Sequence, residues 1–128
     1  MSIGRPPAAR PIALAGLLAA LWSGWAWAHA FPERSEPRVG AVVRASPAAV
    51  RIWFDGDLEP AFSRITVTDS RGQRVDRDDA RVDPQNRRLL GVGLRPLAPG
   101  AYTVRWRVLA VDGHQTEGDY TFTLKGPE

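Results

Sequence analysis

Apolar and polar residues alternate with a period of two along most of the chain, not with the period of about 3.6 that marks a helix. The alternation covers five runs, at 50–54, 64–68, 90–94, 102–108 and 119–124. Each run places its large apolar side chains on one face, as Val50, Ile52 and Phe54 do in the first run. This pattern predicts half-buried antiparallel strands. Two shorter segments, 30–34 and 73–76, are expected to bring the number of strands to about seven.

Turn-forming residues separate these runs, and no segment has the length and amphipathic pattern of a helix. The stretch Leu97-Ala-Pro-Gly-Ala-Tyr102 is typical of a tyrosine corner, in which a Tyr hydroxyl bonds back to the chain a few residues upstream. The length allows one domain. We therefore predict an all-β fold, an immunoglobulin-like β-sandwich of about seven strands.

The start of the chain has the order of a secretory signal peptide. Two arginines precede an apolar stretch, 12–22, and the small-x-small sequence Ala26-Trp27-Ala28 follows it. We predict a signal peptide over residues 1–28 and a mature domain over residues 29–128 that begins with His29. The alternative is an uncleaved membrane anchor, for which the apolar stretch is at the lower limit of length.

The composition of the mature domain excludes several kinds of function. Two of the 17 Lys and Arg residues leave with the signal peptide, so 15 basic residues face 14 acidic ones and the net charge is +1. This balance excludes a strongly basic nucleic-acid binder. The chain has no Cys, and its single Met is Met1, so disulfides, thiolate metal sites, cysteine nucleophiles and soft Cu(I) ligands are all absent.

Strand order predicts which loops meet. In an up-and-down sandwich of about seven strands, the chain start and the loops after the second, fourth and sixth strands lie at one end. Residue 29, the loop at 55–57 and the loop at 111–118 should therefore lie together. The expectation depends on an odd number of strands.

The two histidines of the mature domain are His29 and His114, and both belong to that end. The amine and imidazole of an N-terminal His29 can chelate one metal, His114 can add a third nitrogen, and Asp112 can add an oxygen. Nitrogen and oxygen ligands in a tetragonal plane suit Cu(II), with Zn(II) as the main competitor. The alternative is that Asp112 only shapes an Asp-Gly turn and that both histidines are ordinary surface residues.

Across the mature domain the sequence resembles the CopC family of periplasmic copper-binding proteins. The resemblance follows the His29-Ala30 start and six further motifs: Pro37-x-x-Gly40, Ser46-Pro47, Val50-Arg-Ile-Trp-Phe54, Glu59-Pro-Ala-Phe-Ser63, Gly100-x-Tyr-x-Val104-x-Trp106 and Asp112-Gly113-His114-x-x-x-Gly118. It implies a Greek-key sandwich that binds one Cu(II) per chain through His29, Asp112 and His114.

The resemblance also implies a periplasmic monomer that is not an enzyme, binds no nucleic acid or small-molecule substrate, and sequesters copper or delivers it to a CopD-like membrane importer. Some family members carry a glutamate after the second strand, where this chain has Gly56 between Asp55 and Asp57. Whether either aspartate is a ligand stays open. The Met-rich Cu(I) site of certain members has no counterpart here.

Two other functions remain. One is a metal-free immunoglobulin-like interaction module, which would bind Cu(II) no better than a generic surface histidine does. The other is a copper oxidase or monooxygenase with an N-terminal His, which would need an aromatic substrate face. Trp53 is the only mature Trp expected to point outward, and turnover of a polysaccharide would identify such an enzyme.

Overall fold

The structure, a computed structural model, describes Gly4 and residues 30–127. The predicted signal peptide, apart from Gly4, and His29 lie outside the described residues. The elements are β1 (Pro32–Glu36), β2 (Val42–Val43), β3 (Ala49–Phe54), the short 3-10 helix η1 (Pro60–Phe62), β4 (Arg64–Thr68), β5 (Arg81–Asp83), β6 (Asn86–Gly93), β7 (Gly100–Leu109) and β8 (Gln115–Leu124). Within the described part, no helix is long and apolar enough to cross a membrane.

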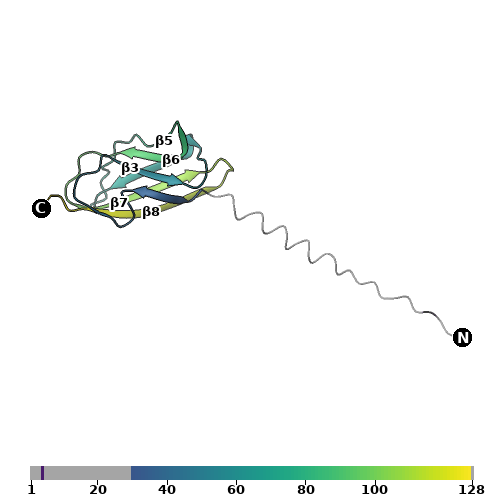
Figure 1. The fold of residues 1–128 in the computed structure, drawn as a ribbon, viewed down its shortest axis with the longest axis horizontal. Coiled ribbons are helices and arrows are strands. Elements are labelled where there is room, and N and C mark those ends of the chain that lie inside the picture. Colours follow the sequence, from purple (N-terminus) through teal and green to yellow (C-terminus); the bar gives the residue numbers. More distant parts are fainter. Residues whose placement is uncertain (1–3, 5–29, 128) are drawn as a thin grey trace.

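The strands form two packed four-stranded sheets (Figure 1). One sheet has the order β1-β3-β6-β5 and the other β2-β8-β7-β4, so the chain crosses between the sheets as in a Greek key. Neighbouring strands are antiparallel except β2, which pairs in parallel with the last two residues of β8. The predicted all-β sandwich is confirmed.

The alternation of the sequence places the core between the sheets. In β3, Val50, Ile52 and Phe54 are buried while Arg51 is exposed. Tyr102 of β7 donates its hydroxyl to the carbonyl of Ala98, which confirms the predicted tyrosine corner. Burial raises the pKa of the Tyr102 phenol.

Trp106 closes the core near one end of the sandwich. Its ring meets Phe54 edge-on, with ring centroids 5.3 Å apart. Trp106 lies directly opposite Gly118 of β8, and its indole occupies the space that a side chain at residue 118 would need. Trp53 lies on the outer face of the other sheet, as predicted, and the guanidinium of Arg34 covers its ring at 3.9 Å.

The strand count differs from the prediction. The first strand begins at Pro32 rather than residue 30, and β2 and β5 are additional strands. Residues 73–76 form only isolated bridges, Thr68↔Arg74 and Asp76↔Leu94, instead of a strand. Two residues in β2 and three in β5 are too few to show an alternation.

Asp76 explains why residues 73–76 do not form a regular strand. Its carboxylate is buried and accepts hydrogen bonds from the backbone N–H of Val67 at 2.8 Å, from the N–H of Asp78 at 2.9 Å and from Arg74 at 2.6 Å. The Asp76 carboxylate therefore accepts hydrogen bonds that the backbone carbonyls of a paired strand would accept in a regular sheet. Burial alone would raise the pKa of Asp76, but the bonds from Arg74, Val67 and Asp78 outweigh it and hold the pKa below its usual value.

The extra strands leave the expected meeting of loops intact. β1 and β8 both start at the end of the sandwich where β3 and β7 stop, so β2, which is parallel to β8, runs in the same direction as β1 and adds no reversal. β5 makes the reversal that was expected of a strand at 73–76. The start of β1, the end of β3 and the turn between β7 and β8 share one end, joined by the pairings Pro32↔Phe54 and Leu58↔Ala110. We call this the hairpin end; it comprises residues 30–31, 55–57 and 110–114.

Candidate metal centre

The turn between β7 and β8 fixes Asp112 and His114. The N–H of Ala110 donates to the carbonyl of His114 at 2.9 Å, and the N–H of Gly113 donates to Ala110 at 2.9 Å. Gly113 has φ +93°, in the left-handed region that favours glycine. The turn thus explains why a glycine stands between the two predicted ligands.

Asp112 and His114 face one another across this turn. Asp112 Oδ1 accepts a hydrogen bond from the backbone N–H of His114 at 2.9 Å and lies 3.3 Å from the ring Nδ1. The two side chains are 35% and 40% exposed, although the Nδ1 atom of His114 is itself buried. Two donor atoms that share a metal at about 2 Å are roughly 3 Å apart, so this pair fits one ion.

The N-terminal segment is fastened to the same end. The Thr116 hydroxyl donates to the carbonyl of Ala30 at 2.8 Å. Asp55 Oδ1 accepts from the N–H of Phe31 at 2.7 Å, and the N–H of Asp55 donates to the carbonyl of Phe31 at 2.9 Å. Ala30 is 1% exposed and lies beside Gly56. The residue that follows His29 is thus held between the loop after β3 and the strand after His114.

The two aspartates of the loop after β3 have partners of their own. Asp55 bonds the N-terminal segment, and Asp57 Oδ1 lies 3.2 Å from Nε of Arg88. The carbonyl of Asp57 accepts from the N–H of Val111 at 3.1 Å, which ties this loop to the turn. Both carboxylates therefore have a structural partner, Phe31 for Asp55 and Arg88 of β6 for Asp57.

The structure brings two of the three predicted ligands together. Asp112 and His114 are neighbours, whereas His29 lies outside the described residues. Among residues 30–127, no group of three or more His, Cys, Asp or Glu side chains is placed to hold a metal. A complete site of the predicted kind thus needs a donor from outside this range.

The residue that sequence reasoning missed is Thr116. Counting back in steps of two from the buried Tyr120 places residue 116 on the inward face of β8. A hydroxyl at an inward position of a strand needs a hydrogen-bond partner, so the sequence does indicate that Thr116 forms a structural contact. The partner, Ala30, is 86 positions away in the sequence, so the pattern alone does not reveal it.

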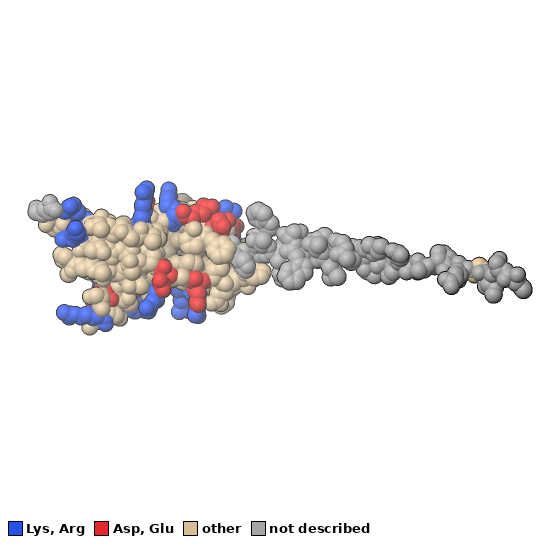
Figure 2. Space-filling model, turned by 90° about the horizontal axis from the view of Figure 1, so that it is seen from below, with Lys and Arg blue, Asp and Glu red and all other residues tan. Residues whose placement is uncertain are grey.

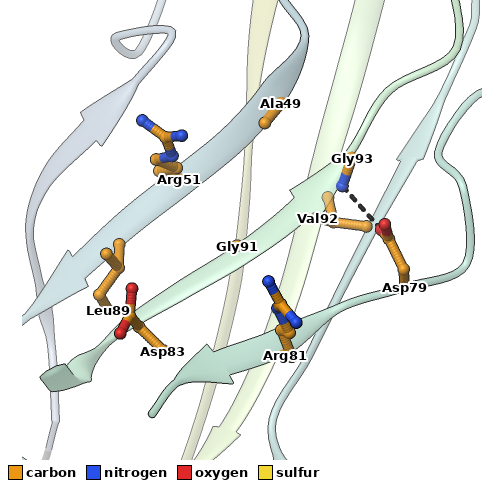
Figure 3. Close-up of a pocket in the computed structure, with 9 residues that line it drawn as sticks. All are labelled: Ala49, Arg51, Asp79, Arg81, Asp83, Leu89, Gly91, Val92 and Gly93. Atoms are coloured by element: carbon orange, nitrogen blue, oxygen red, sulfur yellow. Dashed lines mark hydrogen bonds between the residues drawn. The ribbon is translucent and has the colours of Figure 1, made fainter. Parts of the chain in front are cut away.

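The surface has other features away from the turn. On the face in Figure 2, acidic side chains gather toward the half of the domain in which β1 begins, and basic side chains extend to the opposite end. A hollow of about 210 Å³ lies on the outer face of β3, β6 and β5, where Arg51 and Arg81 flank Gly91 (Figure 3). Neither Asp112 nor His114 lines this hollow.

Comparison with known proteins agrees with these observations. Protein YobA of Escherichia coli (strain K12) is 38% identical over 114 residues, which cover 88% of this chain and 92% of that protein. Copper transport protein CutJ of Bacillus subtilis (strain 168) is 31% identical over 99 residues, which cover 77% of this chain and 18% of that protein.

Solved structures show the same architecture. CopC from Methylosinus trichosporium OB3b superposes with a TM-score of 0.73 and 39% identity, covering 78% of this chain and 97% of that one. PcoC from Escherichia coli, a methionine-rich copper resistance protein, gives a TM-score of 0.65 and 30% identity, covering 77% and 100%.

A CopC domain matches residues 32–125, which include β1 to β8 and the turn that carries Asp112 and His114. The family is one of copper resistance and transport proteins rather than enzymes, as predicted. The chain therefore belongs to the CopC domain family.

Proposed function

We propose that the chain is an exported Cu(II)-binding protein that sequesters or delivers copper in the periplasm. The observation that carries the proposal is the 3.3 Å approach of Asp112 Oδ1 and His114 Nδ1 at the end where Ala30 is fastened. Residue 29 is bonded to Ala30, and successive Cα atoms are about 3.8 Å apart. Cleavage after Ala28 would therefore put a new amino terminus next to Ala30, whose carbonyl is bonded to Thr116, two residues after His114.

In this proposal each ligand has one role. The amine and imidazole of His29 chelate Cu(II), His114 supplies a third nitrogen, and the Asp112 carboxylate supplies an oxygen and one negative charge. Nitrogen and oxygen donors suit Cu(II) better than Cu(I), which prefers sulfur. The one Met of this chain is Met1, whereas PcoC is described as methionine-rich, so we infer a single Cu(II) per chain.

The proposed partner is a CopD-like copper transporter of the inner membrane. CutJ supports this link, because the part that resembles the present chain is 18% of a larger copper transport protein. A domain of this kind is thus joined to a transport function in one relative. In this proposal the domain acts as a monomer and passes copper to that transporter.

An EPR-monitored Cu(II) titration tests the function. The protein is exported from a bacterial host, and its intact mass must show a start at His29. One equivalent of Cu(II) should give an axial spectrum with nitrogen hyperfine structure. A correctly processed protein that binds Cu(II) no better than a generic surface histidine side chain does would refute the proposal and leave a metal-free interaction module.

A further inference from the structure

We propose that Asp55 and Thr116 are positioning residues for the copper site: together they hold the segment Ala30–Phe31 so that residue 29 stays beside Asp112 and His114. Neither residue would bind the metal. The inference rests on the proposed function and adds a residue-level account of how the site keeps its shape and how fast it releases copper.

The contacts of this segment carry the inference. Three successive polar backbone groups are all hydrogen-bonded by Thr116 or Asp55: the carbonyl of Ala30 by Thr116, the N–H of Phe31 by Asp55 Oδ1, and the carbonyl of Phe31 by the N–H of Asp55. Ala30 is buried between these contacts. Its side chain is a methyl group, so packing and hydrogen bonds both fix the segment just before β1.

The Asp55 carboxylate holds the backbone of Phe31 in place and is not proposed as a metal ligand. Its Oδ1 is 2.7 Å from the N–H of Phe31, and a hydrogen bond from a backbone N–H to a carboxylate is shorter and stronger than one between neutral groups. Asp57, two residues further, instead pairs with Arg88 at the surface. The two aspartates of this loop thus have different partners. A substitution of Asp57 is therefore a matched control for a substitution of Asp55.

Thr116 joins the two halves of the site. It follows His114 by two residues in the same hairpin, and its hydroxyl reaches the carbonyl of Ala30, the residue next to His29. One hydrogen bond therefore links the hairpin that carries Asp112 and His114 to the segment that follows His29. Valine has nearly the same shape as threonine but has no hydroxyl to donate.

Asp55 and Thr116 both bond to backbone groups, so substituting either residue leaves every proposed ligand atom unchanged. Their loss should therefore loosen residue 29 without altering which atoms bind Cu(II). The expected signature is faster copper release with an unchanged EPR spectrum. A residue that matters only for folding would lower the unfolding temperature without changing the release rate.

The test measures Cu(II) dissociation by stopped-flow transfer to a chelator, with EPR spectra and thermal unfolding for each variant. Thr116→Val should release Cu(II) about 5-fold faster, and Asp55→Ala about 10- to 100-fold faster, as expected for a lost neutral and a lost charged hydrogen bond. Thr116→Ser keeps the hydroxyl and should restore the parental rate. Asp55→Asn keeps an acceptor oxygen and should fall between parent and Asp55→Ala.

The controls are Asp57→Asn on the same loop and Thr121→Val on the same strand, and both should release Cu(II) at the parental rate. Parental rates in Thr116→Val and Asp55→Ala, with normal Cu(II) binding by the parent, would overturn the positioning role alone. A changed EPR spectrum in Asp55→Asn would also overturn it, because it would make Asp55 a ligand. Failure of the parent to bind Cu(II) would instead refute the proposed function.

Discussion

The indole of Trp106 lies across the Cα atom of Gly118 on the neighbouring strand. A Cβ atom at residue 118 would come within 2.6 Å of Cζ2 of that indole, closer than real Cβ contacts allow. The ring cannot easily turn away, because it also packs edge-on against Phe54. Gly118 therefore allows Trp106 to close the core beside the turn of Asp112 and His114.

Gly118→Ala should destabilise the domain, because the new methyl group must displace the indole. The free energy of unfolding should fall by about 1–3 kcal/mol, the usual range for overpacking. Urea denaturation followed by Trp fluorescence measures it. Gly91→Ala is the matched control, since its Cβ would meet nothing closer than 3.5 Å. Equal stability of the two variants would show that the Trp106 indole can move aside for a side chain at residue 118 at no cost in stability.

Asp112→Asn separates two roles of Asp112: its hydrogen bond within the turn and the negative charge that it would offer to Cu(II). Asparagine keeps an oxygen that can accept the N–H of His114, so the turn should remain, but Cu(II) loses an anionic donor. The affinity for Cu(II) in chelator competition should fall by about 10- to 100-fold. Asp83→Asn is the control, because Asp83 accepts from the N–H of Gln85 at 2.8 Å in the neighbouring hairpin. A similar loss in both variants would argue against a specific role for Asp112.

His114→Ala should weaken Cu(II) binding more strongly than Asp112→Asn, because it removes a nitrogen ligand altogether. The loss should exceed about 100-fold, and the EPR spectrum should show fewer coupled nitrogens. Far-UV circular dichroism should stay that of the parent, since the His114 side chain is on the surface. Parental affinity in this variant would remove His114 from the site.

One additional glycine before His29 should also weaken binding. The extra peptide converts the amine of His29 into an amide, so the two-nitrogen chelate at this residue is lost. Competition with a Cu(II) chelator should show a loss of at least about 10-fold. The same glycine added after Glu128 leaves the amine intact and should have no effect. An unchanged affinity with the N-terminal glycine would exclude the amine as a ligand.

Stability should fall in acid through Asp76. The pKa of this carboxyl is below its unfolded value of 3.8, so the stabilisation is fully present above that value and is lost as the pH falls through the lower folded value. Asp76→Asn should lower stability at neutral pH and flatten its decrease in acid. Unfolding temperatures between pH 6 and pH 2 measure this, with the exposed Asp119→Asn as control. An unchanged slope in Asp76→Asn would contradict the assignment.

The sequence predicted the elements in which side-chain alternation decides the structure. β3, β4, β6, β7 and β8 each bury two or more apolar residues on one face, and all five were predicted. β5 buries only Val82, which leaves no pattern to detect. Residues 73–76 were predicted wrongly because the buried residue is Asp76, whose carboxylate accepts hydrogen bonds from the N–H of Val67 on β4, from the N–H of Asp78 and from the Arg74 side chain.

In the candidate site, too, local contacts could be predicted from the sequence and long-range contacts could not. Asp112 and His114 are close in the sequence, so a tight turn brings them together and the motif suffices to predict it. The contacts of Asp55 and Thr116 with the N-terminal segment depend on how the two sheets close on each other, and no local pattern encodes that. The signal peptide over residues 1–28 and His29 as a ligand stay predictions.

The bond from Thr116 to Ala30 joins the segment just before β1 to the last strand, 86 positions later. A chain that crosses a membrane N-terminus first presents Ala30 long before Thr116 has arrived. The hairpin end can form only after β8 has docked, so a partly translocated or C-terminally truncated chain should lack it. In the proposed export and copper binding, the chain could then bind Cu(II) only after it had been translocated and folded as far as β8.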